Sequence, residues 1–216
     1  METQRLEYAL TAARFLGIKE GSREHQRILD AYNAIRPLPR GYALKNTDPW
    51  CAGFVSAAAV LAGVGHLLPL ECSCAQIIEK ARRMGIWVER DDHVPQIGDW
   101  ILYNWDAKGE GDDTGAPDHV GVVIGVDSEI FVVEGNYENA VKLRIVPRNW
   151  KKIRGFVSPR YRQHTFRTPE DVPDYAQDTI RKLCADGSLR GISDDDLGLT
   201  EDLIRTLVIL DRRGKL

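Results

Sequence analysis

The hydrophobic period of the chain changes near residue 85, and this change restricts the possible fold classes more than any other feature. Before it, apolar residues recur at the spacing of amphipathic helices in four stretches, residues 6–16, 22–35, 48–62 and 73–84. After it come short β-rich runs separated by glycine and proline, at residues 100–103, 119–126, 130–134, 141–146 and 153–157. This order predicts an α+β fold with N-terminal helices packed on an antiparallel β-sheet.

The chain is expected to consist of two parts. The segment after Tyr161 is rich in polar residues and proline, a composition typical of a linker. Beyond it lie two further helical patterns, the second of which follows Thr200 as an N-cap. We therefore predict a main domain over residues 1–164 and a small C-terminal helical segment over residues 165–216. Because so short a segment buries little surface, we expect it to pack on the main domain or on another copy.

Composition and charge exclude several classes of function. The chain has 43% hydrophobic residues, 28% charged residues and a formal net charge of −3, a composition typical of an ordinary globular protein. Neither part has the basic face that binding to nucleic acid requires, so we expect no nucleic-acid partner. There is no long apolar run and no apolar signal sequence at the start, which predicts synthesis in the cytoplasm without a Sec signal and no membrane anchor. The four cysteines are expected to be free thiols.

Cys51 is the first candidate for a reactive group, because it lies in the first turn of the helix predicted at residues 48–62. Asp48 is expected to be the N-cap of this helix, and Pro49 its first helical residue. Unpaired backbone N–H groups and the positive end of the helix dipole favour a thiolate there, and the same N–H groups could hold an oxyanion. A lone cysteine is more often a small buried hydrophobe, so a catalytic Cys51 also needs a base.

The pairing of the next two predicted strands follows from a two-residue turn at residues 127–128. Such a hairpin pairs residues whose numbers sum to 255. Val122 then faces Val133, and Ile124 faces Phe131, on a surface that packs on the core. The side chains between them point to the opposite face of the hairpin.

That opposite face brings together an imidazole, a carboxylate and a carboxamide. His119 lies opposite Asn136 and diagonal to Glu134, and a slip of two residues would place His119 opposite Glu134 without changing the face. Gly121 and Gly125 on the same face are expected to leave room for a substrate. A histidine held by a carboxylate or an amide is the base that a thiol nucleophile requires, since the partner fixes the tautomer and stabilises the imidazolium. The spacing leaves open which of the two side chains dominates.

Five short motifs, in the same order, resemble those of CHAP domains, the cysteine, histidine-dependent amidohydrolases/peptidases. They are TDPWCAGFV at 47–55, GDWILY at 98–103, DHVG at 118–121, VEGN at 133–136 and IRGF at 153–156. The resemblance spans residues 5–161 and is to the variety found in phage and prophage endolysins of Gram-positive bacteria. It implies a papain-like fold that cleaves an amide bond of bacterial peptidoglycan, either between muramic acid and L-alanine or within the peptide stem and cross-bridge.

Carried over position by position, the resemblance implies a role for each polar residue. Cys51 is the nucleophile, His119 is the general base and acid, and Glu134 orients the imidazole. Asn136 is a further polar position of the family, whose role varies.

The resemblance also bears on substrate contacts and on metals. We expect Trp50 and Asp118, the chain neighbours of the nucleophile and the base, to contact the substrate. Some CHAP domains hold calcium in an acidic loop ahead of the cysteine, whereas residues 45–48 offer one carboxylate, so we expect no metal and no other cofactor. Cys72 and Cys74 have no second pair at zinc spacing and are interpreted as packing residues at a helix start.

Three functions are compatible with these observations. The leading one is a peptidoglycan hydrolase, an amidase or endopeptidase that acts on the cell wall after release from the cytoplasm. A catalytically silent cell-wall-binding protein could keep the same fold, and a thiol acyltransferase or transpeptidase could use the same acyl-enzyme. Residues 165–216 resemble the C-terminal segment of such endolysins, which suggests a role in wall contact or assembly. The sequence leaves open which amide bond is cut, the target bacterium and the oligomeric state.

Overall fold

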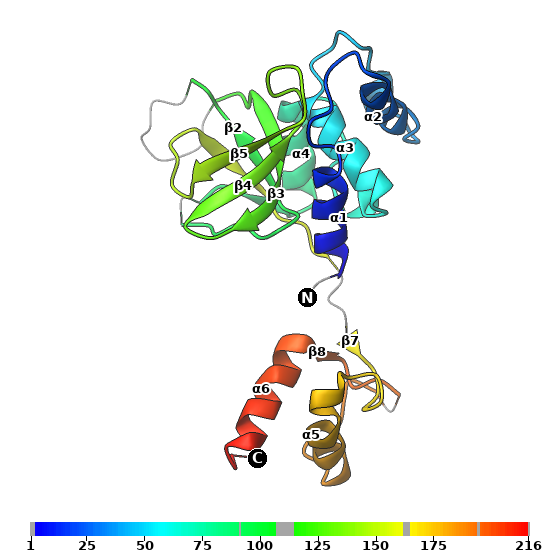
Figure 1. The fold of residues 1–216 in the computed structure, drawn as a ribbon, viewed down its shortest axis with the longest axis vertical. Helices are drawn as coiled ribbons and strands as arrows, with labels where there is room; N and C mark the ends of the chain where they lie inside the picture. The colour runs from blue at the N-terminus through cyan, green and yellow to red at the C-terminus, as the bar shows by residue number, and fades with distance from the viewer. Residues whose placement is uncertain (1–2, 91, 107–114, 162–164, 194, 216) are drawn as a thin grey trace. The chain divides into compact units, whose positions relative to one another are not determined.

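The computed structural model describes residues 3–90, 92–106, 115–161, 165–193 and 195–215 of the 216-residue chain. The chain divides into two compact units, one of residues 4–161 and one made of the remainder (Figure 1). The division falls three residues before the boundary expected at residue 164. The functional roles assigned to the two parts stay a prediction.

The helices of the first unit come first in the chain, where the sequence has helical periodicity. They are α1 (Thr3–Ala13), α2 (Arg23–Asn33), α3 (Cys51–Leu61) and α4 (Cys74–Arg83), with short 3-10 turns η1 (Pro39–Gly41) and η2 (Gly65–Leu67) between them. Ser22 caps α2, since its side chain accepts a hydrogen bond from the His25 N–H. Residues 51–59 of α3 are all buried, which agrees with the apolar, alanine-rich sequence of this helix.

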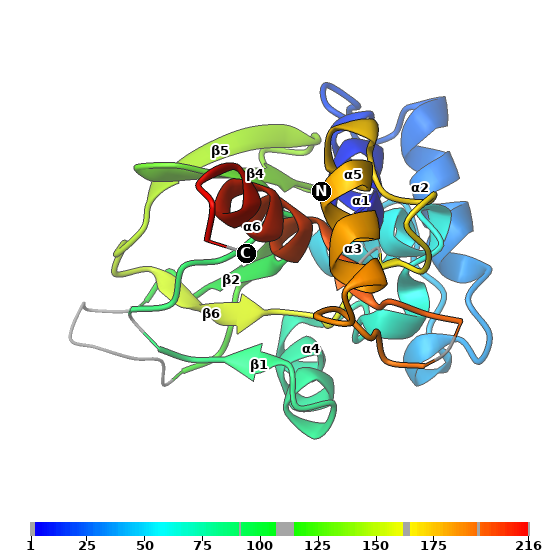
Figure 2. The ribbon, with the colours of Figure 1, turned by 90° about the horizontal axis from the view of Figure 1, so that it is seen from below.

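A single antiparallel sheet forms the other layer of this unit. Its strands are β1 (Trp87–Val88), β2 (Trp100–Tyr103), β3 (His119–Val126), β4 (Glu129–Glu134), β5 (Lys142–Pro147) and β6 (Ile153–Val157), in the spatial order β1-β6-β2-β3-β4-β5. Figures 1 and 2 show the helices gathered to one side of the sheet. The predicted α+β architecture, with N-terminal helices on an antiparallel sheet, is therefore confirmed.

The pleat of the strands divides the apolar side chains between two clusters. Trp100, Leu102 and Val122 pack with the helices in the larger cluster. Tyr103 and Val132 belong to a smaller cluster on the opposite face of the sheet. Because side chains alternate along each strand, both faces of the sheet carry buried apolar residues.

The hairpin of β3 and β4 agrees with the predicted register only near its open end. Val122 pairs with Val133 as expected, but Gly125, not Ile124, pairs with Phe131. Ile124 is therefore an extra residue in a β-bulge, and Val126 pairs with Ile130 where Glu129 was expected. The bulge lies between the paired valines and the turn. It therefore does not change the face of the sheet to which His119 and Glu134, at the other end of the hairpin, point.

The Gly-Asp-Trp motif before β2 ties α1 to the sheet. The Asp99 carboxylate has no exposed surface and accepts hydrogen bonds from Arg5 at 2.8 Å and from the Ser158 hydroxyl at 3.0 Å. The Trp100 indole N–H donates to the Tyr8 hydroxyl at 2.6 Å. These contacts give the motif a structural role in holding the two layers together.

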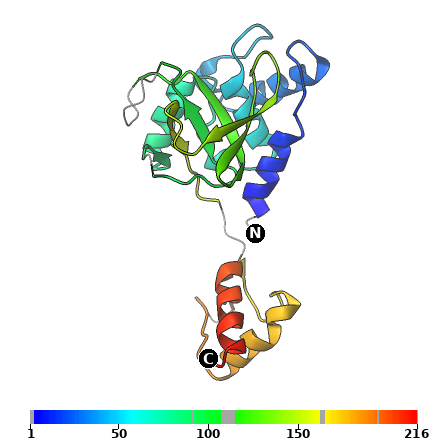
Figure 3. The ribbon, with the colours of Figure 1, turned by 60° about the vertical axis from the view of Figure 1, so that its left-hand side comes forward.

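The second unit has a core of its own. It contains α5 (Asp174–Ala185), α6 (Glu201–Arg212) and the short paired strands β7 (Thr165–Phe166) and β8 (Leu199–Thr200). Figure 3 shows α6 in red beside α5 in gold. Apolar residues from both helices are buried together, among them Ala176, Ile180, Ile204 and Val208. Both helices predicted for this segment are present, and none of the described helices has the length and apolar character of a membrane span.

Candidate active site

Cys51 is the first residue of α3. The helix begins later than predicted, because Asp48 does not act as its N-cap. The Asp48 carboxylate instead accepts a hydrogen bond from the Lys45 N–H at 2.8 Å, and Trp50 occupies the N-cap position. Pro49 consequently precedes the helix. Cys51 therefore lies closer to the positive end of the helix dipole than the sequence indicated.

The surroundings of the Cys51 thiol favour the thiolate. The first helical hydrogen bond joins the Phe54 N–H to the Trp50 carbonyl at 2.8 Å, so earlier N–H groups of α3 face the start of the helix. The pKa of Cys51 lies well below its ordinary value because a hydrogen bond from the Cys74 thiol stabilises the charge, followed in importance by those from His119 and the Ala52 N–H. Together these outweigh burial, which raises the pKa.

His119 is the first residue of β3 and connects Cys51 to Glu134. Its Nε2 lies 3.1 Å from Oε2 of Glu134, so Nδ1 is the ring nitrogen that remains for its hydrogen bond with Cys51. Burial lowers the pKa of His119, but the hydrogen bonds and negative charges of Cys51 and Glu134 outweigh it and raise the pKa to about 9. A lowered thiol pKa beside a raised imidazole pKa is the signature of a thiolate–imidazolium pair.

Glu134 ends β4 with no exposed surface, and a glycine on the neighbouring strand makes room for it. A Cβ at Gly121 would lie 2.7 Å from Cγ of Glu134 and 2.4 Å from Cγ1 of Val132. The space at Gly121 is thus filled by protein side chains. This corrects the expectation that Gly121 leaves room for a substrate.

Arg144 of β5 also reaches the Glu134 carboxylate, and sequence reasoning missed it. Its Nε lies 2.8 Å from Oε1 and 2.9 Å from Oε2 of Glu134. The strand register pairs Val132 with Arg144, so Arg144 is diagonal to Glu134 on the same face. Extending the pairing from the hairpin to the third strand would have indicated this neighbour.

Asn136 is not brought to the imidazole. It follows β4 in a turn with a left-handed backbone, φ 58°, and makes no hydrogen bond to His119 among the contacts of the described residues. The preceding Gly135 lies against α3, where a Cβ would come within 2.5 Å of Cβ of Phe54 and 2.8 Å of Cζ3 of Trp50. The chain therefore leaves the strand at Gly135, which corrects the expectation that Asn136 lies opposite His119.

The two residues expected to contact substrate differ in their accessibility. Trp50 has no exposed surface and donates its indole N–H to Glu20 at 2.9 Å, so it offers no surface to a substrate. Asp118 is exposed, and its carboxylate accepts the Trp105 N–H at 2.6 Å. The expectation for Trp50 is corrected by its burial, whereas Asp118 stays a candidate beside His119.

Cys74 lies at the same site, which the sequence did not indicate. It begins α4, and its sulfur is 3.8 Å from that of Cys51, with both thiols free. The hydrogen bond to Cys51, burial and the negative charge on Cys51 raise the pKa of Cys74, so Cys74 keeps its proton and serves as the hydrogen-bond donor. Within the described ranges, no group of three or more His, Cys, Asp or Glu side chains could hold a metal ion.

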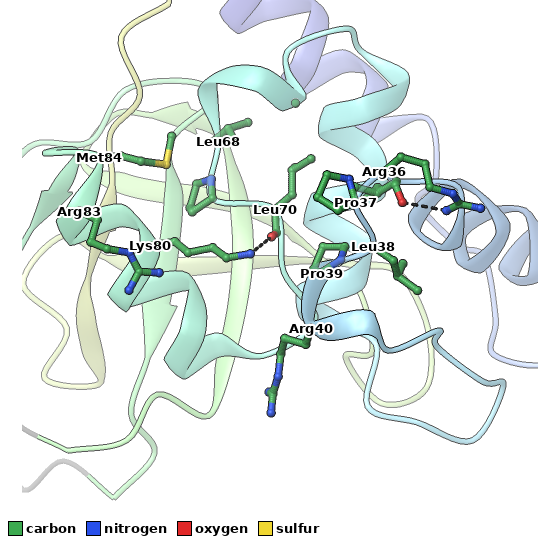
Figure 4. Close-up of a pocket in the computed structure, with 13 residues that line it drawn as sticks. Arg36, Pro37, Leu38, Pro39, Arg40, Leu68, Leu70, Lys80, Arg83 and Met84 are labelled. Atoms are coloured by element: carbon green, nitrogen blue, oxygen red, sulfur yellow. Dashed lines mark hydrogen bonds between the residues drawn. The ribbon is translucent and has the colours of Figure 1, made fainter.

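A separate pocket of about 510 Å³ lies at the other end of α4 (Figure 4). It is lined by the proline-rich segment 35–40 and by basic side chains that do not converge. Arg36 donates to the carbonyls of residues 33 and 35, and Lys80 donates to the Leu70 carbonyl at 2.9 Å. The pocket contains none of the residues around Cys51. It therefore lacks the polar groups aimed at one point that a substrate site needs.

Comparison with known proteins finds similarity to one protein family and to a solved structure. The family model described as CHAP domain matches residues 43–136, a range that contains Cys51, His119 and Glu134. No curated protein matches the chain. Among solved structures, an NlpC/P60 family protein from Bacillus cereus ATCC 10987 is similar, with 21% identity, a TM-score of 0.34, and coverage of 51% of this chain and 31% of that one. This chain thus spans about a third of that protein's length. The CHAP resemblance is confirmed for residues 43–136.

Proposed function

We propose that this protein is a cysteine hydrolase that cleaves an amide bond of bacterial peptidoglycan. The observation that carries the proposal is the arrangement of Cys51, His119 and Glu134. The Cys51 thiol at the start of a helix is hydrogen-bonded to the His119 imidazole, whose other nitrogen lies 3.1 Å from a buried carboxylate oxygen of Glu134. Such an arrangement is the general one for nucleophilic catalysis by a thiol. The CHAP match over residues 43–136 supports the substrate class.

In the first chemical step, the Cys51 thiolate attacks the carbonyl carbon of the amide and forms a carbon–sulfur bond. The carbonyl π electrons move to oxygen, and N–H groups in the first turn of α3 are placed to stabilise that charge. The His119 imidazolium gives its Nδ1 proton to the departing amine when the carbon–nitrogen bond breaks. A thioester on Cys51 and a free amine result.

In the second step, water replaces the amine at the same carbon. Neutral His119 removes a proton from the water, whose oxygen attacks the thioester, and the carbon–sulfur bond breaks to return the thiolate. Glu134 keeps the ring oriented and stabilises the imidazolium each time it forms. The products are a carboxylic acid and the resting thiolate–imidazolium pair.

The bond cut is proposed to be either the muramoyl–L-alanine amide or a peptide bond of the stem or cross-bridge, as in an endolysin that acts on the wall after release. Mass spectrometry of muropeptides from purified Gram-positive walls distinguishes these bonds by the new ends they produce. We expect new free amines and carboxylates in equal amounts. Walls that yield no new ends with folded protein would contradict the proposal and favour a silent wall-binding protein. A ligated product with an added amine would instead identify an acyltransferase.

The second unit is proposed to contribute to wall contact or assembly and not to bond breaking. A chain ending at Tyr161 is expected to cleave a soluble stem peptide at a rate within about threefold of the full chain, because the residues around Cys51 all precede this point. Sedimentation with intact walls, or the oligomeric mass, is expected to change. A folded but inactive shortened chain would show that the second unit belongs to the active site.

A further inference from the structure

We infer that Arg144 is a positioning residue of the proposed catalytic site, which holds the Glu134 carboxylate where it accepts a hydrogen bond from His119. The expected effect on kinetics rests on the proposed function, whereas the structural argument for the inference is independent of that function. Its first basis is that one carboxylate oxygen serves both partners. Oε2 of Glu134 lies 3.1 Å from Nε2 of His119 and 2.9 Å from Nε of Arg144.

Arg144 also holds the second oxygen of the carboxylate. Oε1 of Glu134 lies 2.8 Å from Nε of Arg144. His119 thus fixes one oxygen, whereas Arg144 spans both and defines the plane of the carboxylate. The Glu134 side chain has no exposed surface and that of Arg144 is only 20% exposed, so water competes little with this contact.

Aromatic rings hold the guanidinium of Arg144 in turn. Its central carbon lies 4.0 Å from the ring centre of Tyr137, 5.3 Å from that of Trp105 and 5.8 Å from that of Tyr103. These distances are those of cation–π contacts, and they restrict the rotamers of a long side chain. Trp105 also lies 5.9 Å from the His119 ring, so the same aromatic group borders the imidazole and the guanidinium.

The charges alternate from the Cys51 thiolate through His119 and Glu134 to the guanidinium of Arg144. The direction in which the pKa of His119 changes when Arg144 is substituted therefore tests how Arg144 acts. If Arg144 acted only through its positive charge, its removal would raise the pKa of His119. If it positions Glu134, its removal weakens the hydrogen bond that stabilises the imidazolium, and the pKa of His119 falls. The titratable or charged groups around the imidazole are Cys51 from α3, Cys74 from α4, Tyr103 from β2, Asp118 beside it, Glu134 from β4 and Arg144 from β5.

The test compares Arg144→Gln and Arg144→Lys with Lys142→Gln in the full chain. Lys142 pairs with Glu134 in the strand register, but its ammonium group forms an ion pair with the exposed Glu138. Its substitution therefore removes the same charge from the same strand and leaves the hydrogen bonds of the Glu134 carboxylate to His119 and Arg144 in place. The first readout is the ¹⁵N NMR titration of the His119 ring, assigned with a His119→Gln variant. The second is the pH dependence of kcat and KM on a soluble stem peptide. Thermal unfolding of each variant checks the fold.

For Arg144→Gln we expect the pKa of His119 to fall by about one unit or more and the alkaline limit of kcat to move with it. We expect kcat to fall about 10- to 100-fold with KM within about twofold, as for other residues that orient a reacting group. Arg144→Lys keeps the charge and one donor, so it should show a smaller change in the same direction and remains informative if Arg144→Gln does not fold. Lys142→Gln should match the wild type.

A raised or unchanged pKa of His119 in both Arg144 variants would overturn the inference. If the wild type hydrolyses wall peptides in that case, the proposed function stands and only the inference fails. If the wild type hydrolyses nothing but the pKa of His119 still falls, the positioning role stands and the proposed function fails.

Discussion

Cys51→Ala is expected to reduce amide hydrolysis by on the order of 10⁶-fold, as removal of the nucleophile does in other enzymes that form an acyl intermediate. The loss should appear in kcat on soluble stem peptide and in the release of muropeptides from walls. The fold should persist, because the substitution removes one sulfur from the start of a helix whose other contacts are unchanged. Thermal unfolding and circular dichroism test that point.

Cys184→Ala is the matched control, because Cys184 belongs to α5 in the second unit and its thiol is free. It should retain the wild-type rate. Labelling with iodoacetamide at pH 6 offers a second measurement that needs no substrate. We expect the wild type to react much faster at Cys51 than at Cys184, whose pKa is raised by burial. Hydrolysis by Cys51→Ala at the wild-type rate would rule out the cysteine mechanism.

Glu134→Gln is expected to reduce kcat by roughly 10²- to 10⁴-fold. The amide fills the same volume but removes the negative charge that stabilises the imidazolium. Glu134 helps to raise the pKa of His119 to about 9, so its loss should lower that pKa and shift the alkaline limit of activity to lower pH. The pH profile of kcat, together with the NMR titration of His119, measures both effects.

Asn136→Ala is the comparison that separates the two orienting candidates. Because Asn136 lies in the turn after β4 and not against the ring, we expect its substitution to change kcat by less than about tenfold and to leave the pKa of His119 in place. A larger loss with Asn136→Ala than with Glu134→Gln would reverse the assignment and make the amide the orienting group. Equal rates for Glu134→Gln and the wild type would remove Glu134 from the mechanism.

The sequence predicted the elements whose patterns are local. Strands β3 and β6 have the predicted bounds because glycine, proline and polar residues interrupt alternating β-branched runs on both sides. The two-residue strands β1, β7 and β8 were missed, since so short a segment carries no period to detect. The bulge at Ile124 was missed as well, because an extra residue changes the register without changing composition.

Those parts of the candidate site that depend on local patterns were also predictable from the sequence. His119 and Glu134 share a face through the period of two along neighbouring strands, which local pairing arithmetic captures. Arg144 and Cys74 reach the site through tertiary packing of β5 and α4, which no short-range pattern encodes. The burial of Trp50 also depends on packing, here against Phe54 and Glu20.

The contact of Gly135 with α3 has a consequence for how the protein folds. It joins the end of β4 to the first turns of a helix far earlier in the chain, and contacts between such distant segments form late and slowly. The helical part of the chain contains Cys51 and the β-sheet part contains His119 and Glu134, so neither part forms the proposed catalytic site alone. Reactivity of Cys51 should therefore develop only when refolding reaches the native state, so that timed alkylation during refolding reports completion of the fold without an optical probe.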